Sequence, residues 1–120
     1  PETYCIDEDT AKRLSTYKLE GKKIISVGTT STRTLESACQ KNGRIQPGIS
    51  QSDLFIYPGY SFKYIDGMIT NFHLPKSTLL MLVYAFSGIE EVKEAYNHAI
   101  IKNYRFYTYG DCCMLRRKNG

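Results

Sequence analysis

The sequence lacks an apolar run long enough to cross a membrane. Its longest run, Leu79 to Phe86, is far shorter than the roughly 20 residues of a transmembrane helix, so it predicts a buried helix. No charged and apolar segments typical of a secretory signal follow Pro1. We therefore expect no membrane partner. The absence of an initial Met also makes us expect an excised fragment.

The cysteines lack the spacing of a structural zinc site. None of the four forms a Cys-x-x-Cys pair, and Cys112 and Cys113 are adjacent. Adjacent cysteines rarely bridge each other, because the geometry is strained. We interpret Cys5, Cys39, Cys112 and Cys113 as reduced thiols of a cytoplasmic protein, and we expect no metal site.

The composition is that of one globular domain or a piece of one. The chain has 120 residues, of which 42% are hydrophobic and 23% are charged. The 16 Lys and Arg residues exceed the 12 Asp and Glu residues, which gives a net charge of +4. This mild basicity permits an anionic partner such as RNA or a phosphate, but it does not require one.

Strand and helix patterns alternate over most of the chain. This alternation favours an α/β fold with a central mixed sheet and packed helices. Residues 42–52, with their glycines and a proline, are predicted to form a loop. We predict strands at 3–6, 22–28, 53–57, 60–64, 67–72 and 112–115, and helices at 10–19, 33–41, 77–87 and 89–103, with residues 29–32 as the turn before the second helix.

The expected helices carry apolar residues at helical spacing. The segment 22–28 is short and β-branched, which is typical of a buried strand. The inner helix faces are predicted to consist of Leu14 and Tyr17 in the first helix, Leu35, Ala38 and Cys39 in the second, and Ile89, Val92, Tyr96, Ala99 and Ile100 in the last.

The first candidate site lies where the strand 22–28 passes into a helix. Backbone N–H groups at a helix start attract anions, and hydroxyl groups add donors. Arg33 is suited to hold a carboxylate or a phosphate with two parallel hydrogen bonds. The segment matches neither Gly-x-Gly-x-x-Gly nor the Walker lysine loop. A plain turn with hydroxyl caps and a solvated arginine explains Thr29, Thr30, Ser31 and Arg33 as well.

The second candidate site follows the strand 67–72. Open α/β sheets place ligands where strands end and helices begin. His73 can accept or donate a proton near neutral pH, Asn71 can contact a base or sugar edge, and Lys76 can meet an anion. Alternatively, Pro75 shapes the turn and His73 is structural.

The third candidate is the aromatic segment 104–111. Tyr and Phe rings with an arginine nearby are typical of sites that stack RNA bases. Packing of one face of an extended segment explains the same alternation. The residues of these types are Arg105, Phe106, Tyr107 and Tyr109. Asp111, which follows Gly110, is either a base or a turn residue.

Four stretches, 27–37, 55–63, 69–83 and 104–111, together resemble one family. They are similar to the C-terminal part of the S-adenosylmethionine:tRNA ribosyltransferase-isomerases of queuosine biosynthesis. The resemblance implies that residues 1–120 are the C-terminal portion of a larger α/β domain. The remainder of that domain and an inserted β-barrel would then be absent from this chain.

The resemblance also implies an activity. Family enzymes transfer and isomerise the ribosyl part of S-adenosylmethionine onto 7-aminomethyl-7-deazaguanine in a tRNA anticodon. The product is epoxyqueuosine in tRNA, and adenine and methionine are released. S-adenosylmethionine would be a cosubstrate, the tRNA anticodon stem–loop the partner, and no tightly bound cofactor is implied. We expect the isolated fragment to be inactive.

This chemistry assigns hypothetical roles to the candidate residues. A base must remove a proton next to the sulfonium, and we expect His73 or, second, Asp111 to transfer it. We expect Arg33, with Thr29, Thr30 and Ser31, to hold the methionine carboxylate or an RNA phosphate, and Asn71 and Lys76 to orient the sugar or the tRNA. Two other functions remain open, a non-catalytic RNA-binding α/β module and an unrelated small-molecule enzyme.

Overall fold

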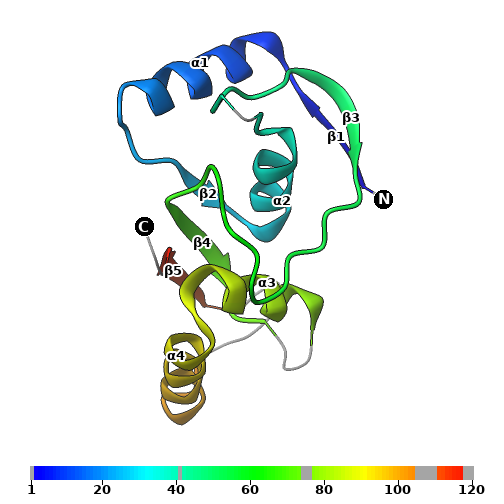
Figure 1. The fold of residues 1–120 in the computed structure, drawn as a ribbon. Helices are drawn as coiled ribbons and strands as arrows, with labels where there is room; N and C mark the ends of the chain where they lie inside the picture. The colour runs from blue at the N-terminus through cyan, green and yellow to red at the C-terminus, as the bar shows by residue number, and fades with distance from the viewer. Residues whose placement is uncertain (1, 41, 74–76, 105–110, 118–120) are drawn as a thin grey trace.

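The structure, a computed structural model, describes residues 2–40, 42–73, 77–104 and 111–117 (Figure 1). Helices and strands alternate along most of the chain, and the strands form two small sheets. This arrangement confirms the predicted α/β class. The elements are β1 (Glu2–Ile6), α1 (Glu8–Leu19), β2 (Ile25–Val27), α2 (Thr29–Ala38), β3 (Gly48–Ser52), β4 (Gly67–Asn71), α3 (Thr78–Ser87), α4 (Ile89–Ile101) and β5 (Cys112–Arg116).

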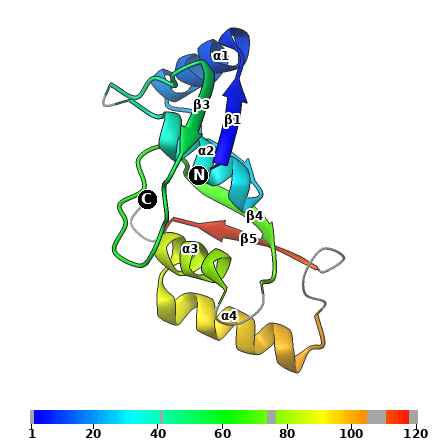
Figure 2. The same cartoon turned by 90° about the vertical axis from the view of Figure 1, so that its right-hand side faces the viewer.

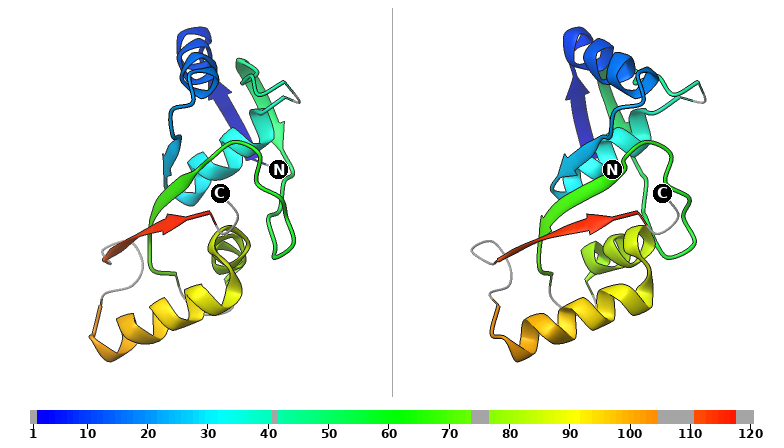
Figure 3. Two further views of the ribbon diagram at one scale, coloured as in Figure 1. Left: turned by 60° about the vertical axis from the view of Figure 1, so that its left-hand side comes forward. Right: turned by 90° about the vertical axis from the view of Figure 1, so that its left-hand side faces the viewer.

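A mixed three-stranded sheet occupies the middle of the molecule, in the order β2-β4-β5. β4 is parallel to β2, with Val27 opposite Ile69, and antiparallel to β5, with Met68 opposite Leu115. Figure 3 shows α3 and α4 below this sheet and α1, β1 and β3 above it. The predicted strands at 67–72 and 112–115 are confirmed as β4 and β5.

One face of the three-stranded sheet is covered and the other is not. On the covered face Ser26, Met68 and Leu115 are at most 9% exposed. On the opposite face Val27 is 68% exposed and Met114 is 61% exposed. The strand predicted at 22–28 is confirmed as β2, although it has only three residues. The expected burial was wrong for Ile25 and Val27, because β2 lies at the edge of the sheet with one face uncovered.

The second sheet pairs β1 with β3 in antiparallel register, with Glu2 opposite Ser52 (Figure 2). The strand predicted at 3–6 is confirmed, whereas the loop predicted over 42–52 was wrong at its end. The sequence of β3, Gly-Ile-Ser-Gln-Ser, has almost no apolar alternation, and four of its five residues are exposed. Pairing with β1 rather than burial holds this strand, so its hydrophobic pattern gave no signal.

The strands predicted at 53–57 and 60–64 were wrong, since this stretch is irregular. The apolar residues there do alternate, and Ile56 is buried while Phe55 is 65% exposed. However, the backbone N–H groups of Lys63 and Tyr64 donate to the side chain of Glu36 instead of to a neighbouring strand. The alternation therefore reflects anchoring of a loop.

Capping residues determine where α1 and α3 begin and where α3 ends. The Asp7 carboxylate accepts the N–H of Thr10 at 2.7 Å and begins α1, two residues before the predicted start. The Ser77 hydroxyl accepts the N–H of Leu80 and begins α3, which ends at Gly88 as predicted. The core that α3 helps to form includes Leu80, Leu82, Val83 and Phe86, all at most 4% exposed.

Three residues predicted for inner helix faces are exposed, and one of them is Ile89 at the start of α4, which is 38% exposed. Tyr17 in α1 is 41% exposed, with the Lys22 ammonium 4.9 Å from its ring centroid, and Ala11 packs into the core instead. Ile100 in α4 is 59% exposed, whereas Val92 and Tyr96 are buried as predicted. All four cysteines are free in the structure.

Candidate functional site

The first two candidate turns meet at one edge of the three-stranded sheet. β2 and β4 are parallel, so their carboxyl ends lie side by side. The N–H of Gly28, which begins the first turn, donates to the carbonyl of Ile69 in β4 at 2.7 Å. The start of α2 therefore lies beside the end of β4, as expected for polar turns at one sheet edge.

The β2–α2 turn leaves its helix start without a side-chain cap. Gly28 stands at the cap position with a φ of 92°, a left-handed conformation that favours glycine, and no side chain accepts from the first turn. Thr30 and Ser31 are exposed. Thr29 is buried, so its hydroxyl is less accessible to a ligand than the sequence suggested. The first turn also contains no acidic residue.

Arg33 lies one turn into α2 and is not a freely solvated side chain. Its Nη2 is 3.2 Å from Glu2 Oε1, and the Arg33 side chain is 21% exposed. Its Nε is buried and has no hydrogen-bond partner among the described residues. Arg33 also lines a small cavity with Phe55, Tyr57 and Leu79. This guanidinium is therefore held in place with one donor still unused.

The β4–α3 turn holds the His73 imidazole. His73 Nε2 lies 3.2 Å from Thr70 Oγ1, and the His73 backbone N–H donates to the Tyr96 hydroxyl at 3.0 Å. Burial lowers the pKa of His73 below its ordinary value of 6.5. The imidazole is therefore neutral at neutral pH and can accept a proton. Burial raises the pKa of Tyr96 to about 12, so its hydroxyl stays protonated.

Asn71 and Asp111 lie at the same end of the sheet. Asn71 ends β4 opposite Cys112, and the carbonyl of Asp111 accepts the N–H of Phe72 at 3.3 Å. Both candidates for proton transfer, His73 and Asp111, therefore flank one strand end. Lys76 and the aromatic segment 105–110 lie outside the described residues.

Sequence reasoning missed Glu36, whose carboxylate is buried in α2 with 2% exposure. Glu36 accepts from the Tyr60 hydroxyl at 2.9 Å and from the N–H groups of Lys63, Tyr64 and Ile65 at 2.8, 2.8 and 3.2 Å. Burial and the Glu36 charge raise the pKa of Tyr60. Four partners from one loop satisfy the carboxylate. No sequence pattern singled out Glu36, because its partners lie 24 to 29 residues away.

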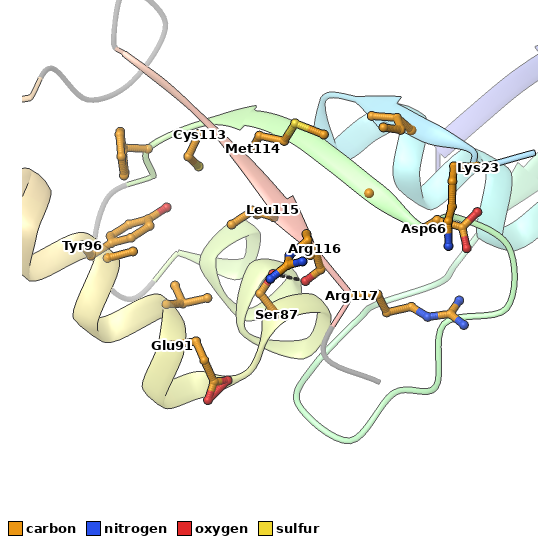
Figure 4. Close-up of a pocket in the computed structure, with 15 residues that line it drawn as sticks. Lys23, Asp66, Ser87, Glu91, Tyr96, Cys113, Met114, Leu115, Arg116 and Arg117 are labelled. Carbon is orange, nitrogen blue, oxygen red and sulfur yellow. Dashed lines mark hydrogen bonds between the residues drawn. The ribbon is translucent and has the colours of Figure 1, made fainter. Parts of the chain in front are cut away.

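A much larger cavity than the one beside Arg33 lies along β5 and α4 (Figure 4) and has a volume of about 860 Å³. Its walls include Ile25, Val92 and Leu115, and Arg116 and Arg117 lie at one end. None of the described candidate residues of the two turns lines it. No sequence pattern indicated this groove, because its walls come from β2, β4, α3, α4 and β5.

Within the described ranges, no three His, Cys, Asp or Glu residues gather as a metal site would require. No helix in the part of the chain that the structure describes is long and apolar enough to span a bilayer. Together the turns define the class: an α/β chain that brings an uncapped helix start with a nearby arginine and a turn with a half-buried histidine to one edge of its sheet.

Comparison with known proteins assigns a family to this class. Residues 1–115 match the family model described as queuosine biosynthesis protein. The chain is 55% identical over 115 residues to the S-adenosylmethionine:tRNA ribosyltransferase-isomerase of Bradyrhizobium diazoefficiens, covering 96% of this chain and 31% of that protein. Identity to the same enzyme of Xanthobacter autotrophicus is 53%, covering 96% of this chain and 32% of that protein.

A solved structure agrees. The S-adenosylmethionine tRNA ribosyltransferase of Thermotoga maritima superimposes with a TM-score of 0.88 at 43% identity, over 95% of this chain and 40% of that chain. The chain belongs to the queuosine biosynthesis protein family, which confirms the resemblance inferred from the four motifs. It spans about a third of the length of the curated relatives that it matches.

Proposed function

We propose that this chain forms part of an S-adenosylmethionine:tRNA ribosyltransferase-isomerase. The observation that carries the proposal is 55% identity over 115 residues to an enzyme of that name. The reaction moves and isomerises the ribosyl group of S-adenosylmethionine onto 7-aminomethyl-7-deazaguanine in tRNA. It yields epoxyqueuosine and releases adenine and methionine. Its cosubstrate is S-adenosylmethionine, its partner is the tRNA anticodon stem–loop, no tightly bound cofactor takes part, and its location is the cytoplasm.

His73 is the proton-transfer residue of this proposal. The sulfonium acidifies the neighbouring ribose carbon, and a neutral imidazole is a suitable base for that proton. The lowered pKa of His73 and its fixed backbone, bonded to Tyr96, support the role. The protonated imidazole can then return the proton to the departing adenine. Asp111, at the same strand end, is the second candidate.

The start of α2 is the anion-binding part of the site. Uncapped N–H groups, the Thr30 and Ser31 hydroxyls and the Arg33 guanidinium together suit the methionine carboxylate or an RNA phosphate. Thr29 contributes through its backbone, because its side chain is buried. Asn71 and Lys76 are proposed to orient the ribose or the tRNA backbone.

One face of the three-stranded sheet β2-β4-β5 is uncovered in this chain. Sheets with parallel strands are usually covered on both faces, yet Ile25, Val27 and Met114 are 44%, 68% and 61% exposed. We propose that residues 1–120 are the C-terminal portion of an α/β domain. The family's remaining chain would cover this face and the groove along β5. The 120-residue chain alone is then expected to be inactive.

A hybrid enzyme tests the proposed function. In it, this chain replaces the matching third of the Bradyrhizobium diazoefficiens relative. The hybrid is incubated with S-adenosylmethionine and tRNA that carries the precursor base, and released adenine is measured. We expect adenine only when both substrates are present. A folded hybrid that binds tRNA in a salt-dependent way without responding to S-adenosylmethionine would instead indicate an RNA-binding module.

A further inference from the structure

Two exposed aromatic rings stand beside Arg33, and the roles assigned above do not use them. Phe55 is 65% exposed and Tyr57 is 48% exposed. Their ring centroids are 6.4 Å apart with an interplanar angle of 29°, so the rings are stacked. A single exposed apolar side chain is ordinary on a protein surface. Two neighbouring rings with accessible faces form a platform that can bind another flat ring.

The chain on both sides of the rings is anchored. Ile56, between them, is 4% exposed and belongs to the core. Farther along the loop, the Tyr60 hydroxyl and the Lys63 N–H donate to the buried Glu36 carboxylate. A ligand that binds to such a loop loses little free energy to ordering it. Glu36 is therefore a positioning residue for the platform.

The charge beside the platform is positive. Arg33, Phe55 and Tyr57 line the same small cavity together with the start of α3. This cavity holds only about 10 Å³, so no ring fits inside it, and a flat ligand must lie on the exposed ring faces. The Arg33 side chain, which is 21% exposed, supplies a guanidinium at the edge of this cavity. Stacking rings next to a guanidinium are the usual chemistry for nucleobases attached to anionic groups.

We propose that Phe55 and Tyr57 stack a nucleobase whose attached phosphate or carboxylate group meets Arg33. The proposal rests on the proposed function, which supplies two sources of such a ligand. One source is a base of the tRNA anticodon loop, and the other is the adenine of S-adenosylmethionine. Both contain a flat aromatic ring and an anionic group: phosphates join the ribose of the tRNA base, whereas the methionine carboxylate is joined to the adenosine through the sulfonium. The two arms of the test distinguish them.

The test measures binding of each substrate to the hybrid enzyme. An anticodon stem–loop RNA is titrated in one arm and radiolabelled S-adenosylmethionine in the other. Phe55→Ala and Tyr57→Ala are each expected to weaken the Kd about 10-fold in one arm. Tyr57→Phe keeps the ring and is expected to retain the affinity. Tyr17→Ala removes a 41% exposed ring from α1 and serves as the matched control.

The outcomes separate the inference from the proposed function. Weaker binding confined to the RNA arm identifies a tRNA base, and weaker binding confined to the other arm identifies adenine. Unchanged affinity in both arms overturns the inference and leaves the proposed function intact. A lower melting temperature with unchanged affinity also overturns it, because the rings would then be packing residues. An unsubstituted hybrid that binds neither substrate contradicts the proposed function and the inference together.

Discussion

The two strand-to-helix turns of the central sheet share a topology but differ in the hydrogen-bond donors that remain free at the helix start. The α2 turn has no side-chain cap and exposes Thr30 and Ser31. In the β4–α3 turn, by contrast, the Ser77 hydroxyl already accepts an N–H at the start of α3. A capped helix start has fewer donors left for an anion. This difference supports the proposal that the anion binds at the first turn.

The second turn differs in the side chain that it buries. His73 is desolvated, which lowers its pKa, and its surroundings fix both its backbone and its ring. Arg33, at the first turn, keeps part of its side chain exposed and its Nε unused. One turn thus presents a fixed positive charge and the other a neutral base. The two turns therefore have similar backbone positions but different side chains, a charged arginine in one and a neutral histidine in the other.

The largest effect is expected from Glu36→Ala, because this buried carboxylate anchors the loop beside the α2 turn. The substitution leaves three backbone N–H groups, two of them buried, and the Tyr60 hydroxyl without their acceptor. We expect a loss of roughly 3–5 kcal/mol in the free energy of unfolding, measured by urea denaturation. Glu94→Ala, at an exposed position of α4, is the control. A loss equal to that of the control would show that the carboxylate does not anchor the loop.

His73→Ala separates chemistry from binding at the second turn. In the hybrid enzyme we expect kcat for adenine release to fall by about 100-fold or more, with substrate affinities unchanged. The reason is that a proton acceptor is lost while the anion-binding turn stays intact. Unchanged turnover would remove the proton-transfer role from His73 and leave Asp111 as the candidate.

Arg33→Ala is expected to have the opposite signature. Loss of a charge-assisted contact should weaken substrate affinity about 10-fold, with a small effect on kcat. Arg13→Ala, which breaks an exposed ion pair with Asp9 in α1, is the control for lost charge. If Arg33→Ala lowers kcat and leaves the affinities unchanged, the two turns do not divide the tasks as proposed.

Ser77→Ala tests the cap that distinguishes the second turn. The hydroxyl accepts the Leu80 N–H at 3.1 Å. Its removal should lower the free energy of unfolding by about 1 kcal/mol, as measured by urea denaturation. The matched substitution Ser31→Ala, at an exposed position of α2 that caps nothing, should have little effect. Equal losses at both positions would contradict the difference between the turns.

The smallest effect is a pH dependence from His73. Its pKa is lowered in the folded state below 6.5, so the unfolded chain binds more protons just below that pH. Stability should therefore be full above 6.5 and decline as the pH falls toward the folded pKa. Urea denaturation on either side of 6.5 measures the decline, and His73→Asn should reduce it. A steeper decline of stability in the variant would contradict a lowered pKa of His73 in the folded state.

Local signals explain which parts of the site could be predicted from the sequence. The turns at Gly28 and Ser77 were predicted because a glycine and a capping hydroxyl act within a few residues of their own position. The role of Glu36 was not, because its partners lie 24 to 29 residues away. The alternating residues 53–57 look like a strand in the sequence, although their alternation only separates anchored from exposed side chains.

In the sheets, too, the sequence predicted what depends on local residues and missed what depends on distant ones. β4 was predicted because burial gave it an apolar sequence, whereas β3 was missed because it is held by backbone pairing with β1. The exposure of β2 followed from its edge position and its uncovered face, which no local pattern encodes. The groove along β5 was missed for the same reason, since tertiary packing alone brings its walls together.

The most direct measurement of the central claim is a structure of the hybrid enzyme with S-adenosylmethionine and the anticodon stem–loop bound. The account predicts that the ribose reaches His73 while an anionic group of one of the two substrates contacts Arg33 or the start of α2. Substrates seated in the groove along β5, out of reach of both turns, would contradict it.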